Sequence, residues 1–149
     1  MLIENHNAPA SIRATPGRWT ERMRLKLIAE DLPISDNRVV LREGEAETIW
    51  NGHSAYGRDA LKAGAAALPD LLPFGVEDMF VGGELVSEDH IQGTHRMGVD
   101  PDTSVVDDHM RCHGVSGLYA PGAGAFPTSS PANPTLTLSA LALRAGRAI

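Results

Sequence analysis

Apolar and basic residues alternate over residues 22–27, where Met23, Leu25 and Leu27 stand between two arginines and a lysine. This alternation predicts a strand with one buried face. A second short run, rich in valine, spans residues 37–41, and the proline, serine and aspartate between the two runs are typical of a turn. The pattern therefore predicts an antiparallel pair of strands.

Two helices are predicted further along the chain. Residues 54–68 are rich in alanine, and Pro69 is expected to end that helix. The last segment, which runs to Ile149, begins with Asn133 as a good N-cap and Pro134 at the first helical position. Its apolar residues lie nearly all the way round the helix, which is typical of a helix buried inside a larger body.

The rest of the chain is predicted to be mostly irregular. Residues 1–20 show no period, so we expect a loose N-terminal segment. Residues 73–87 are expected to be irregular, and residues 90–131 to be loop with two short apolar runs at 104–106 and 118–120. Few strands accompany so much buried helix, and no G-x-G-x-x-G motif follows a strand. We therefore expect the chain to be one end of a larger protein.

Composition narrows the class of protein. The 149 residues are 42% hydrophobic and 21% charged, as in an ordinary soluble domain, and the net charge of −6 argues against a nucleic-acid partner. Cys112 is the single cysteine, so a disulfide within the chain is excluded. No apolar stretch approaches the roughly 18–20 residues of a membrane helix. The N-terminus has no secretory pattern, which leaves the compartment open between the cytoplasm and, for a longer natural protein, the periplasm.

The sequence contains two sets of residues that could in principle bind a metal ion. A zinc site would draw on His95, His109, Cys112 and His113. Their spacing matches no common zinc pattern and no paired cysteines are present, so no metal is expected. A calcium loop would draw on Asp100, Asp102 and Asp107. The terminal bidentate glutamate is missing, so these aspartates are interpreted as turn residues.

A series of short motifs resembles the C-terminal part of the glucose–methanol–choline (GMC) oxidoreductases. The motifs span residues 90–98, 100–101, 104–107, 117–120, 126–127, 133–137 and 140–144. Each is weak alone, but their order and spacing over about sixty residues are specific to the family. Residues 27–33 with 37–39 also resemble a strand pair of the family's substrate domain. Asn133, with the preceding Pro-Gly-Ala-Gly-Ala-Phe-Pro segment, is most similar to the bacterial gluconate or fructose dehydrogenase branch.

The resemblance implies FAD as the cofactor and an α+β fold. Antiparallel substrate-domain strands would be followed by a C-terminal strand and a buried helix that complete an FAD-binding α/β domain. Residues 1–20 would then be a loose segment, residues 21–89 part of the substrate-binding region, and residues 90–149 the region that completes the flavin site. The glycine-rich fingerprint of the family is absent from these residues, so we expect this chain alone to bind FAD poorly.

His90 and Asn133 match the family's two active-site positions. In alcohol oxidation by a flavin, a base takes the hydroxyl proton while a hydride passes to flavin N5, and histidine has a suitable pKa for that base. The resemblance assigns this role to His90, and to Asn133 the holding of the substrate oxygen. The alternatives are a loop histidine bonded to backbone and an asparagine that only caps the last helix.

The cofactor contacts implied by the resemblance involve two segments. The last helix begins at Pro134 and Thr135, and its unpaired N–H groups would favour the negative N1/O2 edge of reduced flavin. Gly122 and Ala123, followed by Gly124, match a segment that lies beside the ribityl and phosphate groups. Many relatives have aspartate where this chain has Gly122, so a simple turn is the alternative there.

Around His90, the resemblance leaves supporting roles for three neighbours. Gly93 and Thr94 are expected to shape the loop that carries His90, and Arg96 is expected to be structural.

The first functional hypothesis is an FAD-dependent dehydrogenase or oxidase that acts on a CH–OH group of a sugar, sugar acid or other alcohol. The second is a non-catalytic remnant, or a module that completes a partner carrying the FAD domain. The expected partners are a small-molecule substrate and the missing FAD-domain portion or a partner subunit.

Overall fold

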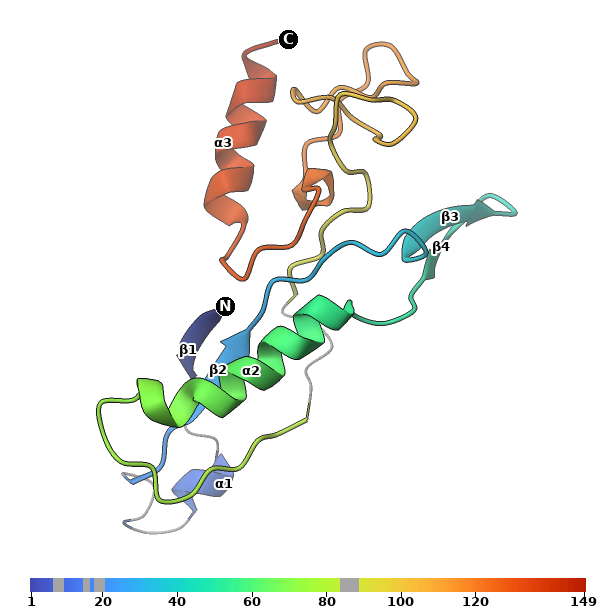
Figure 1. Ribbon diagram of the computed structural model, residues 1–149. Coiled ribbons are helices and arrows are strands. Elements are labelled where there is room, and N and C mark those ends of the chain that lie inside the picture. Colours follow the sequence, from blue (N-terminus) through green and yellow to red (C-terminus); the bar gives the residue numbers. More distant parts are fainter. Residues whose placement is uncertain (7–9, 15–16, 18–20, 84–88) are drawn as a thin grey trace.

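The computed structural model describes residues 1–6, 10–14, 17, 21–83 and 89–149. Its elements in chain order are β1 (Leu2–His6), α1 (Ala10–Arg13), β2 (Arg24–Ile28), β3 (Arg38–Arg42), β4 (Glu45–Ile49), α2 (Ala55–Leu71), the 3-10 turn η2 (Ala123–Ala125) and α3 (Thr135–Gly146). Figure 1 shows α2 beside β1 and β2 at one end of the molecule, and α3 with a large loop region at the other. The predicted α+β class is confirmed.

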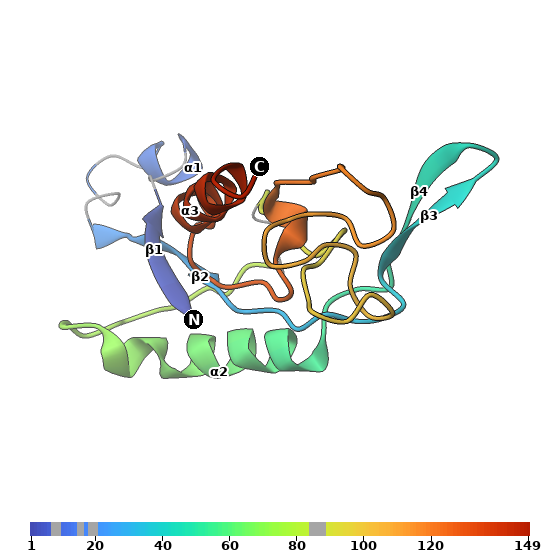
Figure 2. The ribbon, with the colours of Figure 1, turned by 90° about the horizontal axis from the view of Figure 1, so that it is seen from above.

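The strands pair differently from the sequence prediction. β1 pairs with β2, from Leu2 opposite Ile28 to His6 opposite Arg24, and β3 pairs with β4. The predicted pairing of residues 22–27 with 37–41 is therefore wrong, as is the expectation of a loose segment where β1 lies. Glu43 and Gly44 both have positive φ, 52° and 88°, which is the geometry of a two-residue hairpin turn. This local turn pairs β3 with the strand that follows it, so the hairpin projects from the body (Figure 2).

Helix α2 packs against β2 through small residues. Gly64 is buried, and a Cβ atom there would overlap the Met1 thioether and lie 3.2 Å from Leu27 Cδ2. Within β2, Ile28 is buried whereas Met23, just before the strand, is exposed, so the predicted buried face is only partly correct. Pro69 does not end α2, which continues to Leu71. Pro69 has no backbone N–H, so a single helical hydrogen bond is lost there, and the helix ends two residues later.

An aspartate joins the end of β2 to the start of α2. Ser54 caps α2 by accepting a hydrogen bond from the Gly57 N–H at 3.0 Å. The Ser54 hydroxyl and N–H donate to Asp31 Oδ1 at 2.5 and 3.0 Å, while His53 Nδ1 donates to Asp31 Oδ2 at 2.8 Å. Asp31 also forms a bridge with Ser129. The Asp31–His53–Ser54 cluster therefore ties together three segments that are far apart in sequence.

The Asp31 carboxylate should make stability depend on pH. Partial burial raises the pKa of Asp31, but the hydrogen bonds from Ser54 and His53 outweigh it and hold the pKa below 3.8. Because the folded-state pKa is lowered, the stabilisation is present above about pH 4 and is lost as pH falls through the folded-state value. Asp31→Asn should lower the free energy of unfolding at pH 7 and weaken its fall in acid, as measured by urea denaturation across pH. Asp102→Asn, on an exposed turn, is the matched control, and an equal acid response in both variants would contradict the assignment.

The loop region from residue 90 to residue 131 packs around a small core. The buried residues of this core are Val106, Met110, Ala125 and Ala145. The expected C-terminal strand is present in the described residues only as isolated bridges, such as Val106 with Cys112 and Arg111 with Tyr119. Met110 and Gly117 have φ of 60° and 75°, and these turns interrupt the apolar runs before a continuous strand can form.

Helix α3 contacts this core along one side only. Ala145 is buried and Leu138 and Leu141 pack on the core, but Leu136 and Leu143 are 84% and 59% exposed. Nothing in the described residues covers the opposite side of α3, so the burial of this helix inside a larger body stays a prediction. No helix among the described residues is long and apolar enough to cross a membrane.

Candidate functional site

The segment that follows His90 is fixed by backbone hydrogen bonds to the turn η2. The His95 N–H donates to the Gly124 carbonyl at 3.1 Å, and the Met97 N–H donates to the Ala125 carbonyl at 2.8 Å. These bonds place the first loop of the family motif directly against the Gly-Ala-Gly-Ala segment. The two candidate regions that the sequence separated by about thirty residues are therefore one structural unit.

Gly124 allows the His95 side chain to lie on the turn. A Cβ atom at Gly124 would overlap Thr94 Oγ1 and come within 2.5 Å of His95 Nδ1. The ring is held at both nitrogens, with Nε2 3.1 Å from the Ala120 carbonyl oxygen and Nδ1 3.2 Å from Thr94 Oγ1. His95 therefore fixes the loop that carries His90, a role that the sequence prediction missed. The run of small residues at 122–125 was the available signal, since such a run permits close approach of a ring.

His90 lies at the start of this loop. Its side chain is half-buried, and it makes no hydrogen bond or ion pair with any residue in the described part of the chain. The alternative of a loop histidine bonded to backbone is not supported by these contacts. Gly93, with φ of 84°, turns the chain three residues later and lies against the Phe126 carbonyl, as expected for a loop-shaping residue.

Asn133 lies exposed before α3 and does not cap it. The N-cap position is occupied by Pro134, which has no side chain able to accept a hydrogen bond, and the first intrahelical bond runs from the Leu138 N–H to the Pro134 carbonyl at 2.9 Å. The predicted capping by Asn133 is therefore wrong by one position, and its amide is left for other partners. In the described residues no hydrogen bond joins Asn133 to His90.

The residues that the resemblance assigns to FAD fit the flavin end of that cofactor. Helix α3 begins at Thr135 without a side-chain cap, so its first N–H groups are free to face an anionic edge. Gly122 is extended, with φ of 173°, and Ala123 begins η2 with its side chain half-buried. A Cβ atom at Gly122 would be 3.6 Å from the His95 ring, an ordinary contact. Neither Gly122 nor Ala123 has a polar side chain, so any polar contact from these two residues comes from their backbone groups.

Two aspartate side chains of the loop region accept hydrogen bonds from backbone N–H groups of the turns. The Asp100 carboxylate accepts from the Asp102 N–H at 2.9 Å, and that of Asp107 accepts from the His109 and Arg111 N–H groups at 2.8 and 3.0 Å. Slight burial raises the pKa of Asp107, but the two backbone donors outweigh it and hold the pKa below 3.8. The prediction of turn residues is confirmed at Asp100 and Asp107.

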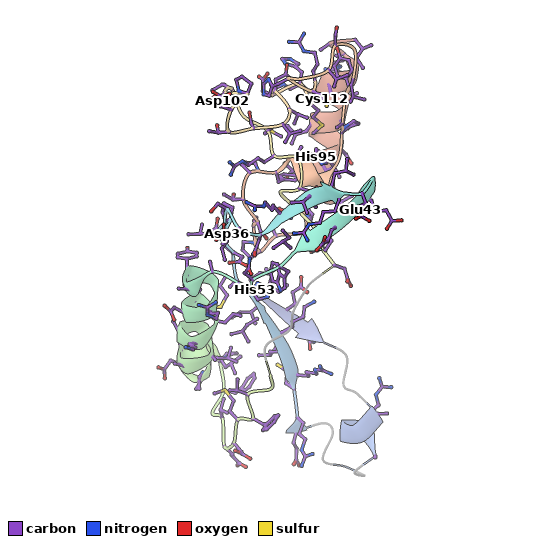
Figure 3. All side chains as sticks on the ribbon, turned by 90° about the vertical axis from the view of Figure 1, so that its right-hand side faces the viewer. Asp36, Glu43, His53, His95, Asp102 and Cys112 are labelled. Carbon is purple, nitrogen blue, oxygen red and sulfur yellow. The ribbon has the colours of Figure 1, made fainter. Side chains whose placement is uncertain are left out.

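The four histidine and cysteine side chains considered for zinc do not converge among the described residues. His113 Nε2 is engaged by Ser104 Oγ at 3.0 Å, and His95 by the Ala120 carbonyl. Figure 3 shows His95 and Cys112 at the α3 end of the molecule and His53 at the start of α2. The potential metal ligands that do gather in the described part are Asp107, Asp108 and His109. Arg144 binds Asp108 and Arg111 binds Asp107, so basic side chains already neutralise this acidic group.

Arg96 is structural as expected, since its Nε donates to the Thr103 carbonyl at 2.8 Å.

Known proteins are similar to this chain either over most of its length or over about 60 residues. The chain is 31% identical to the fructose dehydrogenase large subunit of Gluconobacter japonicus over 128 residues, 80% of this chain and 24% of that protein. It is 45% identical to paromamine 6'-oxidase of Streptomyces fradiae over 60 residues, and 40% identical to pyranose 2-oxidase of Tricholoma matsutake over 60 residues. Each of those two matches covers 40% of this chain and 11% of the relative.

The chain thus spans about a quarter or less of the length of the curated relatives it matches. The model of the family described as GMC oxidoreductase matches residues 35–142, most of the chain. This match covers the hairpin, α2, the His90 loop, η2 and most of α3. The chain belongs to the GMC oxidoreductase family.

Proposed function

We propose that the protein containing this chain is an FAD-dependent oxidoreductase that oxidises a CH–OH group of a sugar, a sugar acid or another alcohol. The observation that carries the proposal is the His90 ring, half-buried and unbonded among the described residues, on a loop that His95 and Gly124 hold in place. The sugar-oxidising relatives named above support the substrate class. Residues 21–89 would contribute to substrate binding and residues 90–149 to the flavin site.

Each site residue has a specific role in this proposal. A nitrogen of the His90 ring takes the proton from the substrate hydroxyl, and the Asn133 amide donates a hydrogen bond to the same oxygen. The first N–H groups of α3 and the backbone of Gly122 and Ala123 hold the flavin end of the cofactor. FAD, when bound, supplies the acceptor for the hydride that leaves the substrate carbon.

The second candidate is a module that completes a partner polypeptide carrying the FAD domain. The exposed apolar side of α3 favours it, because Leu136 and Leu143, which are seven residues apart on the helix, are 84% and 59% exposed. Apolar side chains exposed on one side of a helix are typical of a covered interface. In either case the same His90 loop would face the same flavin.

Anaerobic mixing with possible substrates tests the proposal. The FAD-loaded protein should lose its visible flavin absorbance with at least one member of a panel of aldoses, ketoses, sugar acids and primary alcohols. Deuterium at the reacting carbon should slow that loss, because hydride transfer is part of the measured step. An FAD-loaded protein whose flavin no member reduces would contradict the proposed activity. FAD binding that requires a separate polypeptide would favour the second candidate.

A further inference from the structure

The Asp31 carboxylate ties the chain that leaves β2 to the first turn of α2. It accepts hydrogen bonds from the Ser54 hydroxyl and N–H through Oδ1, and from His53 Nδ1 through Oδ2. Gly57, in the first turn of α2, is buried, and a Cβ atom there would lie 3.0 Å from Asp31 Oδ1. The carboxylate therefore lies directly against the helix, and its bonds fix the Asp31 backbone to the start of α2.

The backbone of Asp31 in turn pairs with the segment that leads to Asn133. Asp31 and Ser129 form an isolated antiparallel bridge. Beyond the bridge, the Ser130 hydroxyl accepts a hydrogen bond from the Ala132 N–H at 3.1 Å, so the chain makes a turn immediately before Asn133. The link between Ser129 and Asn133 is therefore short and internally bonded. A shift of Ser129 is expected to carry Asn133 with it.

The stretch between η2 and α3 is also held at its other end, by the loop that carries His90. The His95 N–H of that loop donates to the Gly124 carbonyl in η2 at 3.1 Å. Figure 1 shows the chain between η2 and α3 reaching the segment that follows β2, where Ser129 pairs with Asp31. The position of this stretch relative to His90 is therefore set by two anchors, one of which is Asp31.

We propose that Asp31 is a positioning residue, which fixes Ser129 and thereby holds the Asn133 amide at the substrate oxygen from which His90 takes the proton. The inference rests on the proposed function, since it takes Asn133 to donate a hydrogen bond to that oxygen. Asp31 touches neither substrate nor flavin in this role and acts only through Asn133. Its effect can still be large, because a misplacement of about 1 Å at a group that orients the substrate can slow a reaction about 10²-fold.

A double-mutant cycle on flavin reduction tests this role in the FAD-loaded protein. Asp31→Ala removes every hydrogen bond of the carboxylate and should slow reduction about tenfold at a saturating concentration of the fastest sugar in the panel above. In a protein that already carries Asn133→Ala, the same substitution should slow reduction less than about twofold, because no amide is left to be misplaced. Asp31→Asn keeps an oxygen that can accept from Ser54, so it should recover most of the lost rate.

Leu68→Ala is the control for a general loss of stability. Leu68 is buried in α2, about 20 Å along the helix from Ser54. Its truncation should weaken the packing around α2 but leave flavin reduction close to normal at temperatures well below unfolding. Amide exchange followed by mass spectrometry gives a measurement that is independent of activity. Peptides that cover residues 129–133 should exchange faster in Asp31→Ala than in Leu68→Ala.

The possible outcomes separate this inference from the proposed function. If the losses from Asp31→Ala and Asn133→Ala multiply in the double variant, Asp31 acts only on the general fold and the inference is wrong, while the proposed function stands. Unchanged exchange of residues 129–133 in Asp31→Ala would also contradict the inference alone. If no member of the panel reduces the flavin of the unaltered protein, the proposed function fails and the inference fails with it.

Discussion

Replacing His90 with alanine is expected to slow flavin reduction by the substrate about 10²- to 10⁴-fold, the usual contribution of a positioned general base. In the proposed function the ring takes the hydroxyl proton, and an alanine side chain has no group that could accept it. The described residues give His90 no other bond, so the substitution should leave stability nearly unchanged. Stopped-flow measurement of the reductive half-reaction gives the rate, and thermal unfolding checks the fold.

His109→Ala is the matched control for this experiment. His109 lies in the same loop region, and its ring contacts the exposed Asp108 at 2.9 Å. This variant should reduce its flavin at close to the normal rate. Flavin reduction that is unaffected by His90→Ala would remove His90 from the role of base, and an equal loss in both variants would indicate a general effect on folding.

Gly124→Ala is expected to destabilise the site without altering any group that takes part in the chemistry. The added methyl group would overlap Thr94 Oγ1 and the His95 ring, and the ring cannot move without losing its bond to the Ala120 carbonyl. Overpacking of this kind costs about 1–3 kcal/mol. The displaced loop carries His90, so flavin reduction should slow as well. The free energy of unfolding from urea denaturation and the rate of flavin reduction measure the two effects.

Gly114→Ala supplies the comparison for that substitution. Gly114 is exposed in the same loop region, and a Cβ atom there meets nothing within 4 Å. The variant should keep the stability and the flavin reduction of the unaltered protein. If Gly124→Ala were as stable as Gly114→Ala, the close approach of His95 to the turn would not be a constraint on the site.

The local parts of the fold were predictable from the sequence. The strands predicted at residues 22–27 and 37–41 and the helix predicted at residues 54–68 agree in kind with β2, β3 and α2, because alternation and composition are local properties. The pairing of strands was not predictable in the same way. It depended on a two-residue turn with positive φ at Glu43 and Gly44, and on a short first strand that has too few residues for its period to show.

The candidate site shows the same division. His90 and Asn133 were identified from motif order, and the capping role of Asn133 was wrong because Pro134 occupies that position. The Asp31–His53–Ser54 cluster was missed, although Ser54 had been placed at the start of a helix. His53 and Ser54 follow Asp31 by more than twenty residues in the sequence, and only the packing of α2 against β2 brings the three side chains together.

The sequence by itself determined the family and indicated two candidate active-site side chains, because these depend on residue types in a fixed order. The tertiary structure decided which contacts those side chains and their neighbours make. It showed that the His95 ring lies on Gly124 and fixes the loop that carries His90, and that Asn133 is not used as a cap. These features depend on the distance between segments remote in the chain, and no local pattern encodes such distances.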